Sequence, residues 1–269
     1  MPPVTMMPSR RHALLLGGSA AVVAGGRAAF GQPRPSAVPR VAAASDLKFA
    51  LDEIIAAFKR DTGRDIVPVY GSSGNFRRQI AQGAPFEMFM SADEDFVFQL
   101  ADEGLTRDRG SLYGIGRIVL LAPHASALAV DAGLLGLKAA LADGRIRRFA
   151  IANPEHAPYG RAAEEALRHA GLWEAIKPRL VLGENVSQAA QFALSGSTEG
   201  GIVALSLVKA PQLAQAGRHA LIAADWHRPL AQRMVLLRQS GEAAVLFHAY
   251  LQGPSARAVL ERYGFSLPG

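Results

Sequence analysis

Strand-like and helix-like segments alternate along this chain from Pro39 to its end, and this alternation limits the possible folds more than any other feature. The first pair shows the pattern: an apolar run at residues 40–45 precedes residues 46–63, where Leu47, Leu51 and Ile54 recur at helical spacing. The expected strands are 40–45, 65–71, 86–93, 116–123, 147–153, 179–183, 201–205, 219–224 and 228–239. The expected helices are 46–63, one that carries Phe76, Ile80 and Ala81, and 94–104, 132–144, 160–171, 173–177, 186–196, 242–253 and 254–264.

Strands separated by helices predict an α/β fold with parallel sheets. No segment repeats at a fixed period, so a solenoid is not expected. With 269 residues, 49% of them hydrophobic, the chain can bury one large core or two smaller ones. No Pro-, Ser- or Gly-rich linker divides the part after Pro39, so two lobes would be joined by short crossings.

The first 36 residues have a different character. Arg10 and Arg11 precede an apolar run from Ala13 to Ala24, which is too short to span a bilayer comfortably, and a small, proline-containing segment follows. This order is typical of a twin-arginine export signal that is removed on maturation. A disordered N-terminus or a misassigned start is the alternative. The sequence therefore predicts an exported, periplasmic protein.

Composition excludes several classes of function. The chain has no cysteine, which rules out disulfides, thiolate metal sites, cysteine catalysis and a lipid anchor on cysteine. The pI near 10.0 is compatible with nucleic-acid binding. However, residues 1–36 hold four arginines and no acidic residue, so their removal lowers the formal net charge from +6 to +2. The remaining charge is spread along the chain, and nucleic-acid binding is not expected.

The stretch GSSGN, residues 71–75, lies where an expected strand gives way to a helix. It lacks the Lys-Ser/Thr pair of a Walker loop and the spacing of a Gly-x-Ser-x-Gly nucleophile elbow. Ser72, Ser73 and Gly74 therefore stand at a helix start, where unpaired N–H groups and the helix dipole favour an anion. Ordinary N-capping by serine is the simpler alternative.

The same arrangement recurs three times. Ser45, Tyr159 with Gly160, and Val186 with Ser187 each stand at an expected helix start that follows a strand-like run. Because the carboxyl ends of strands in an open α/β sheet share one edge, these helix starts can converge on one cleft. Such a cleft binds an oxyanion through hydroxyls and backbone amides without a countercharge.

Catalytic patterns are weak. The seven histidines show no metal-ligand spacing. His156 with Ser73 would suit an exported hydrolase, yet no triad spacing supports it. Glu155 and Glu184 are candidates for paired carboxylates, although solvated loop acids are the simpler interpretation. Arg77 and Arg78 point to different sides of a helix, so at most one could face the cleft.

Seven segments, taken in order, resemble the periplasmic molybdate-binding proteins of ABC importers, and the resemblance runs from about Pro39 to the end. They are VAAASDLKFALDEIIAAF, YGSSGNFRRQIAQGAPFEMFMSADEDF, GRIVLLAP, IANPEHAPYGRAAEEAL, ENVSQAAQFALSG, GIVALS and GPSARAVLERYGF. The resemblance implies a two-lobe periplasmic binding protein fold, each lobe a mainly parallel sheet flanked by helices, with the ligand in the cleft between them. It places lobe 1 at 39–115 and 228–269 and lobe 2 at 116–227, after the export signal at 1–36.

The resemblance further implies a monomer that is not an enzyme, needs no cofactor and coordinates no metal directly. It would bind molybdate or tungstate as the oxyanion and deliver it to a membrane permease with its cytoplasmic ATPase. Carried onto this chain, the ligand-binding residues are Ser45, Ser73, Tyr159 and Val186. A binding protein for another tetrahedral oxyanion, chiefly sulfate, remains the alternative.

Three positions in this chain call for comment. Some family members have a tyrosine where this chain has Ala204, and Tyr159 could offer a replacement hydroxyl. Asp46 directly follows Ser45, although a carboxylate beside a dianion is unfavourable. We therefore expect Asp46 to turn outward or to cap its helix.

Overall fold

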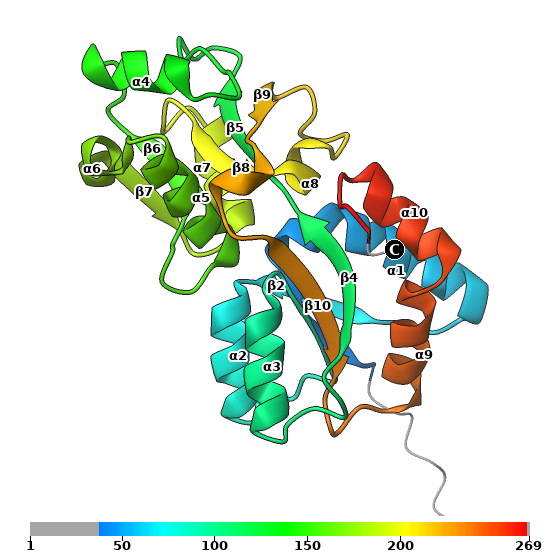
Figure 1. The fold of residues 1–269 in the computed structure, drawn as a ribbon. Helices are drawn as coiled ribbons and strands as arrows, with labels where there is room; N and C mark the ends of the chain where they lie inside the picture. The colour runs from blue at the N-terminus through cyan, green and yellow to red at the C-terminus, as the bar shows by residue number, and fades with distance from the viewer. Residues whose placement is uncertain (1–37, 268–269) are drawn as a thin grey trace, which may run out of the picture. The chain divides into compact units, whose positions relative to one another are not determined.

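The structure is a computed structural model that describes residues 38–267. The predicted export signal at 1–36 lies outside this part of the chain. The described residues build two five-stranded sheets, each flanked by helices (Figure 1). The α/β class expected from the sequence is confirmed.

The first sheet has the strand order β2-β1-β3-β10-β4. Its strands are β1 (Arg40–Ala44), β2 (Val67–Gly71), β3 (Met88–Ser91), β4 (Ser111–Gly116) and β10 (Leu230–Leu236). Strand β1 pairs in parallel with β2 and β3, whereas β10 runs antiparallel to β3 and β4. The sheet is therefore mixed: β1, β2, β3 and β4 run in one direction, and β10, through which the chain returns to the sheet, runs against them.

Alternating side chains of these strands enter two separate cores. Val41 and Ala43 pack with Met88 in one core, while Ala42 packs with Phe89 in the other, as the two-residue period of a strand requires. The first core is covered by α1 (Lys48–Thr62), α9 (Glu242–Leu251) and α10 (Pro254–Arg262). The second core is covered by α2 (Ser73–Ala81) and α3 (Glu94–Asp102).

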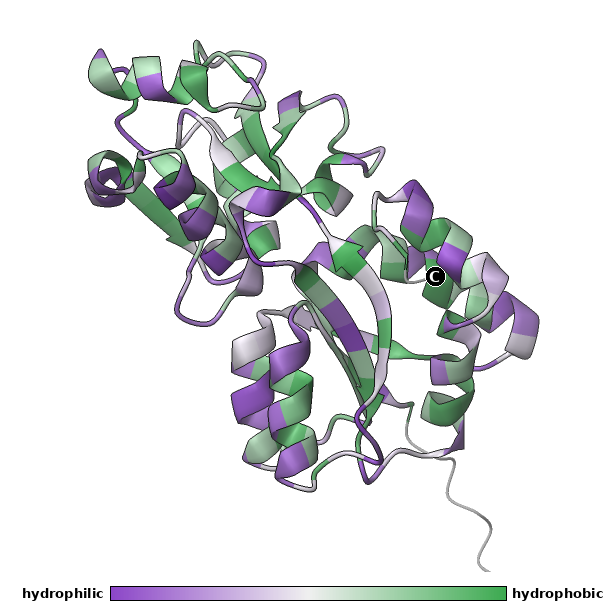
Figure 2. Cartoon of the chain, viewed as in Figure 1, coloured by the Kyte–Doolittle hydropathy of each residue, from purple (hydrophilic) through white to green (hydrophobic). Residues whose placement is uncertain are grey.

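The second sheet has the order β7-β6-β8-β5-β9. Its strands are β5 (Ile118–Pro123), β6 (Phe149–Ala152), β7 (Leu180–Gly183), β8 (Gly201–Ala204) and β9 (Gly217–Leu221). Its helices are α4 (Leu135–Ala142), α5 (Pro158–His169), α6 (Trp173–Ile176), α7 (Val186–Leu194) and α8 (Leu205–Val208). Strand β6 pairs in parallel with β7 and β8, and β5 runs antiparallel to β8 and β9. The strands are largely hydrophobic, and the adjoining helices carry hydrophilic residues outward (Figure 2).

Two connections join the sheets. Arg117 alone separates β4 from β5, and residues 222–229 lead from β9 to β10 through the short 3₁₀ turn η3 (Ala224–Trp226). Two further 3₁₀ turns are η1 (Ser45–Leu47) and η2 (Lys177–Arg179). No helix among residues 38–267 is both long and apolar enough to cross a membrane.

Strand β4 was not expected from the sequence. It contains two glycines and no apolar alternation, and it is held instead by its pairing with β10 along five registered positions. Helix α5 also begins earlier than expected, at Pro158, which suits the first helical position because proline lacks an N–H. Tyr159 and Gly160 therefore lie within its first turn.

Candidate functional site

The four helix starts singled out in the sequence meet at one small pocket. They follow β1, β2, β6 and β7, whose parallel pairings place their carboxyl ends at common edges. The pocket is lined by Ala44, Ser45, Asp46, Gly71, Ser72, Ser73, Ala92, Ala157, Pro158, Tyr159, Asn185 and Val186. All four predicted site residues, Ser45, Ser73, Tyr159 and Val186, are thus brought together from both sheets.

The two serine hydroxyls are fixed by hydrogen bonds that they accept. Ser73 is fully buried, and its Oγ accepts the backbone N–H of Ala92 at 2.9 Å. Ser45 Oγ accepts the backbone N–H of Ser187 at 3.3 Å. Each oxygen uses a lone pair in these bonds, so each hydroxyl proton remains available to donate to a ligand.

Backbone amides supply further donors. Helix α7 starts at Val186, and the Asn185 side chain caps it by accepting the N–H of Gln188 at 3.1 Å. This oxygen accepts from the N–H of the third helical residue and not from that of the first, Val186. The N–H of Val186 therefore has no partner within the helix. Tyr159 occupies the equivalent first turn of α5. Both helices also direct the positive end of their dipoles toward the pocket.

Asp46 does not turn outward, and the expectation from the sequence is wrong. Its side chain is 1% exposed, caps no helix, and lines the pocket. Oδ2 accepts hydrogen bonds from Gln232 Nε2 at 2.6 Å and from the Tyr159 hydroxyl at 2.9 Å. Gln232 is in turn held by the Tyr113 hydroxyl, which donates to its Oε1 at 2.6 Å. Its two long-range partners, one of them held in place by Tyr113, make burial of the carboxyl possible.

Burial raises the pKa of Asp46 to about 6, although hydrogen bonds from Gln232 and Tyr159 and the nearby backbone N–H groups of Asp46 and Leu47 lower it. Burial likewise raises the pKa of Tyr159 well above its ordinary value, and the negative charge of Asp46 adds to this effect. The pKa of Tyr113 is raised for the same two reasons. Both phenols are therefore neutral donors across the physiological range.

The Tyr159 hydroxyl lies in the pocket wall, but its proton points to Asp46. Its oxygen also accepts from Gln232 Nε2 at 3.0 Å, so both its donor and one acceptor position are occupied. Ala204, which carries no hydroxyl, is fully buried at the end of β8 and does not line the pocket. The serines and amides therefore make up most of the free donor set.

Within the described part of the chain, no basic side chain lines the pocket. Arg77 pairs with Glu103 and Arg78 donates to Asn75, as expected for residues outside the cleft. The hydrolase pairing of Ser73 with His156 does not form, because His156 Nδ1 lies 3.0 Å from the hydroxyl of Ser72 instead.

The two candidate acids do not form a pair. The N–H of Glu155 donates to Asn153 in a turn at 3.1 Å. Glu184 is hydrogen-bonded to Asn75 and lies 3.5 Å from His156 Nε2. Neither residue lines the pocket.

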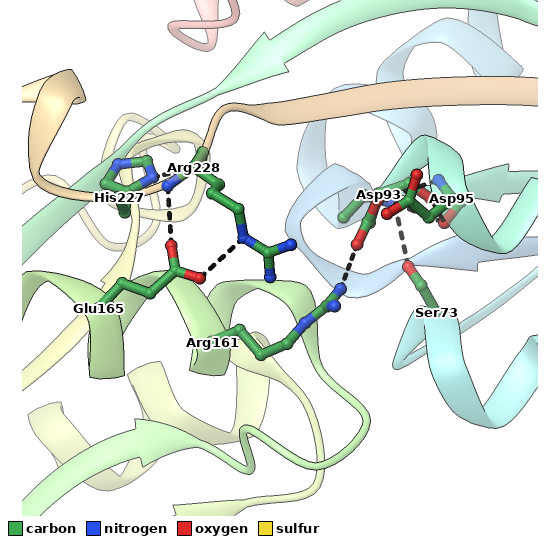
Figure 3. Close-up of polar contacts among 9 residues, drawn as sticks. Ser73, Asp93, Asp95, Arg161, Glu165, His227 and Arg228 are labelled. Carbon is green, nitrogen blue, oxygen red and sulfur yellow. Dashed lines mark hydrogen bonds and ion pairs between the residues drawn. The ribbon is translucent and has the colours of Figure 1, made fainter.

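Residues from the two sheets touch directly around the pocket. The N–H of Gly74, in α2, donates to the carbonyl of His156 at 3.0 Å. The hydroxyl of Ser187, in α7, donates to the carbonyl of Ser45 at 2.8 Å. Arg161, in α5, forms an ion pair with Asp93, the N-cap of α3 (Figure 3). These contacts join the two sheets directly beside the pocket.

A larger cavity of about 260 Å³ adjoins the pocket at Pro158. Figure 3 shows Arg161 reaching Asp93 and Arg228 paired with Glu165 on its rim. Its charged lining comprises Asp93, Glu94, Asp95, Arg161, Glu165 and Arg228. Four carboxylates against two guanidinium groups disfavour an anion there, so the smaller pocket is the better oxyanion site despite its size.

Between residues 38 and 267, no group of three or more His, Asp or Glu side chains is arranged to hold an ion. The donors of the pocket are hydroxyl and amide hydrogens, which bind anionic oxygen rather than a cation.

Comparisons with known proteins agree with this geometry. A family model described as bacterial extracellular solute-binding protein matches residues 39–266. A relative from Azotobacter vinelandii, named Molybdate-binding protein ModA, is 34% identical over 249 residues, which cover 91% of this chain and 96% of the relative. The protein of the same name from Escherichia coli K12 is 32% identical and covers 84% and 88% of the two chains.

Solved structures show the same fold. The Azotobacter vinelandii periplasmic molybdate-binding protein superposes with a TM-score of 0.78 at 30% identity, over 86% of this chain and 100% of that one. The sulfate-binding protein SubI of Mycobacterium tuberculosis has a TM-score of 0.69 at 14% identity, which indicates a common fold alone. From the matched family model and these relatives, the chain belongs to the bacterial extracellular solute-binding proteins.

Proposed function

We propose that this protein captures molybdate or tungstate outside the cytoplasm and delivers it to the permease of an ABC importer with its cytoplasmic ATPase. One observation carries the proposal: hydroxyls and helix-start amides from both sheets converge on one pocket that no basic side chain lines. The family consists of solute-binding proteins rather than enzymes. The names of the relatives from Azotobacter and Escherichia favour molybdate as the solute.

The donor set suits a tetrahedral dianion. Ser45, Ser73, Tyr159 and Val186 are the proposed ligand-binding residues, the two serines through hydroxyls and the others through helix-start amides. Hydrogen bonds to a charged acceptor contribute about 1.5–3 kcal/mol each, so several of them offset the association cost of about 4–15 kcal/mol. Molybdate carries four acceptor oxygens and no proton, so all its oxygens can be surrounded by donors.

Two lobes explain how the ligand is enclosed. We assign residues 39–115 and 228–269 to lobe 1 and residues 116–227 to lobe 2, with the crossings at Arg117 and at residues 222–229 as hinges. Ser45 and Ser73 belong to lobe 1, whereas Tyr159 and Val186 belong to lobe 2. A ligand that contacts both lobes stabilises the closed form by its differential affinity. The closed monomer then docks on the permease, after export directed by residues 1–36.

Calorimetric titration of the purified protein with molybdate, tungstate, sulfate and phosphate tests the proposal. We expect heat from the two metal oxyanions and, from sulfate, a much weaker signal. Binding of sulfate in preference to molybdate would instead support the alternative oxyanion. Absence of binding to either metal oxyanion would overturn the proposed function.

A further inference from the structure

One acceptor interrupts the donor lining of the pocket. Asp46 is 1% exposed and lines the pocket, yet its Oδ1 is buried without a hydrogen-bond partner among residues 38–267. The other oxygen, Oδ2, is fully engaged by Tyr159 and Gln232. Buried polar atoms in proteins are nearly always paired, so an unpaired oxygen beside the pocket calls for a partner, which a ligand in the pocket can supply.

Among residues 38–267, no cation balances this carboxyl. The elements with the most extensive contacts to η1 are α1, α7, α8 and β2, and neither α7 nor α8 carries a titratable residue. On α1, Lys48 pairs with Asp52 at 3.2 Å, and Tyr70 of β2 donates to the same Asp52 at 2.5 Å. The remaining groups near the carboxyl, Tyr113 and Tyr159, are neutral donors.

We propose that the pocket takes up one proton together with each tetrahedral dianion, and that Asp46 Oδ1 shares this proton with a ligand oxygen. The inference rests on the proposed function, because the dianion must occupy this pocket. An ionised carboxylate and a dianion in contact repel each other strongly when both are buried. A proton between them replaces this repulsion with a charge-assisted hydrogen bond. One proton from solvent joins the carboxylate, and the neutral carboxyl that results donates a hydrogen bond to the dianion.

The carboxyl also changes which oxyanions the pocket admits. A lining made only of donors rejects hydrogen phosphate, because the ligand's own proton finds no acceptor there. With Asp46 ionised, hydrogen phosphate can donate its proton to Oδ1 and bind without uptake of another. Asp46 therefore influences the choice between two dianions. Molybdate needs a proton from solvent to bind beside this carboxyl, whereas hydrogen phosphate supplies its own.

Molybdate affinity should consequently depend on pH. The pKa of Asp46 is raised by burial to about 6 in the unliganded site, and a bound dianion raises it further. At a pH between these two pKa values, Asp46 is ionised in the free protein and protonated in the complex. The association constant then falls by about tenfold for each pH unit above about 6.

The substitution Asp46→Asn provides the matched variant. An amide oxygen can still accept from Tyr159 and Gln232, while the amide nitrogen places a donor where Oδ1 stood. His156, whose ring hydrogen-bonds Ser72 beside the pocket, is retained in both proteins, so any contribution it makes is common to the two titrations.

The experiment measures molybdate binding by calorimetry at about pH 7.5, in buffers with different ionisation enthalpies, and repeats the titration from about pH 6 to about pH 8. We expect uptake of close to one proton by the wild type and none by Asp46→Asn. The affinity should fall by up to about 100-fold over this range for the wild type and stay constant for the variant. Hydrogen phosphate should compete with molybdate more effectively for the site of the wild type than for that of Asp46→Asn.

The outcomes separate this inference from the function on which it rests. Tight binding of molybdate by the wild type without proton uptake overturns the shared proton and leaves the proposed function intact. Equal proton uptake by wild type and variant also overturns it, since another group would then titrate. Absence of molybdate binding at every pH contradicts both. The buffer comparison on the wild type alone decides the question if the variant fails to fold.

Discussion

The backbone N–H of Gly74, at the start of α2, donates to the carbonyl of His156, just before α5, at 3.0 Å. This bond joins segments of the two proposed lobes beside the pocket. A Cβ on residue 74 would lie 2.6 Å from that carbonyl oxygen and 3.1 Å from the Cα of His156. Because these are backbone atoms, neither can move away cheaply, and only glycine permits this approach.

We expect Gly74→Ala to weaken molybdate binding by at least about tenfold, a loss of about 1.4 kcal/mol in binding free energy, because closure around the ligand is hindered. The unliganded protein should also lose some stability, because the new Cβ meets the backbone of His156 in the structure without ligand, and the gain of about 0.5–1 kcal/mol from alanine in a helix offsets only part of this loss. Calorimetric titration and thermal unfolding without ligand measure the two effects separately. Gly133→Ala is the control, because its new Cβ would meet its nearest atoms at 3.4 and 3.6 Å. Equal affinity of wild type and Gly74→Ala would show that closure does not need this contact.

Ser73→Ala removes both a ligand donor and an internal acceptor. We expect molybdate affinity to fall by about 10- to 100-fold, the equivalent of about 1.5–3 kcal/mol for a charge-assisted hydrogen bond. The free energy of unfolding should also fall by about 1–3 kcal/mol, because the buried N–H of Ala92 loses its partner.

Ser240→Ala distinguishes these two consequences. Ser240 is also buried, and its hydroxyl bonds to the carbonyls of Glu87 and Leu237, away from the pocket. Titration and urea unfolding of both variants should show a stability loss in each and an affinity loss in Ser73→Ala alone. An affinity loss of similar size in both would remove Ser73 from the proposed ligand shell.

The alternation of strands and helices was sufficient to bring the helix starts that carry Ser45, Ser73, Tyr159 and Val186 to one cleft, whereas the choice of these four as ligand-binding residues came from the resemblance to the molybdate-binding family. Each stands at the start of a helix after a strand, and topology alone then brings such positions to a shared edge. This inference uses only local signals, namely apolar periodicity and small or hydroxyl residues at helix starts. It therefore needs no knowledge of which side chains meet across the fold.

The orientation of Asp46 depends on information of another kind. Its burial requires Gln232 and Tyr159, which are 186 and 113 residues away in the sequence, and neither is marked by a local pattern. The rule that a carboxylate beside a dianion is unfavourable predicted the opposite orientation. Strand β4 was missed for a related reason, because its glycine-containing sequence becomes a strand only through pairing with β10.

Arg161 and Asp93 form the ion pair that joins α5 to the N-cap of α3, with side chains 30% and 20% exposed. The guanidinium also lies 5.4 Å from the ring centre of Phe96, in α3. We expect Arg161→Met to speed molybdate release by about two- to fivefold, or about 0.5–1 kcal/mol, because a partly exposed pair is screened by solvent. Stopped-flow dissociation at low and high salt measures this effect, which should shrink as salt increases.

Arg168→Met is the control for this ion pair. Arg168 lies on the same helix, but its partner Glu164 lies four residues before it, so the pair does not bridge the two sheets. Its removal should leave the release rate unchanged. If both substitutions speed release equally, the ion pair between Arg161 and Asp93 has no special role in closure.

The buried carboxyl of Asp46 should also make the stability of the unliganded protein depend on pH. Its pKa is raised by burial from 3.8 to about 6, so the folded state binds more protons than the unfolded state between these values. The free energy of unfolding therefore falls as pH rises through this window, by up to about 3 kcal/mol for a difference of about two pKa units. Asp46→Asn cannot ionise and should avoid this loss. Urea unfolding of both proteins should give similar stabilities near pH 4 and a more stable variant above pH 7, whereas parallel curves across the whole range would show that Asp46 does not titrate while buried.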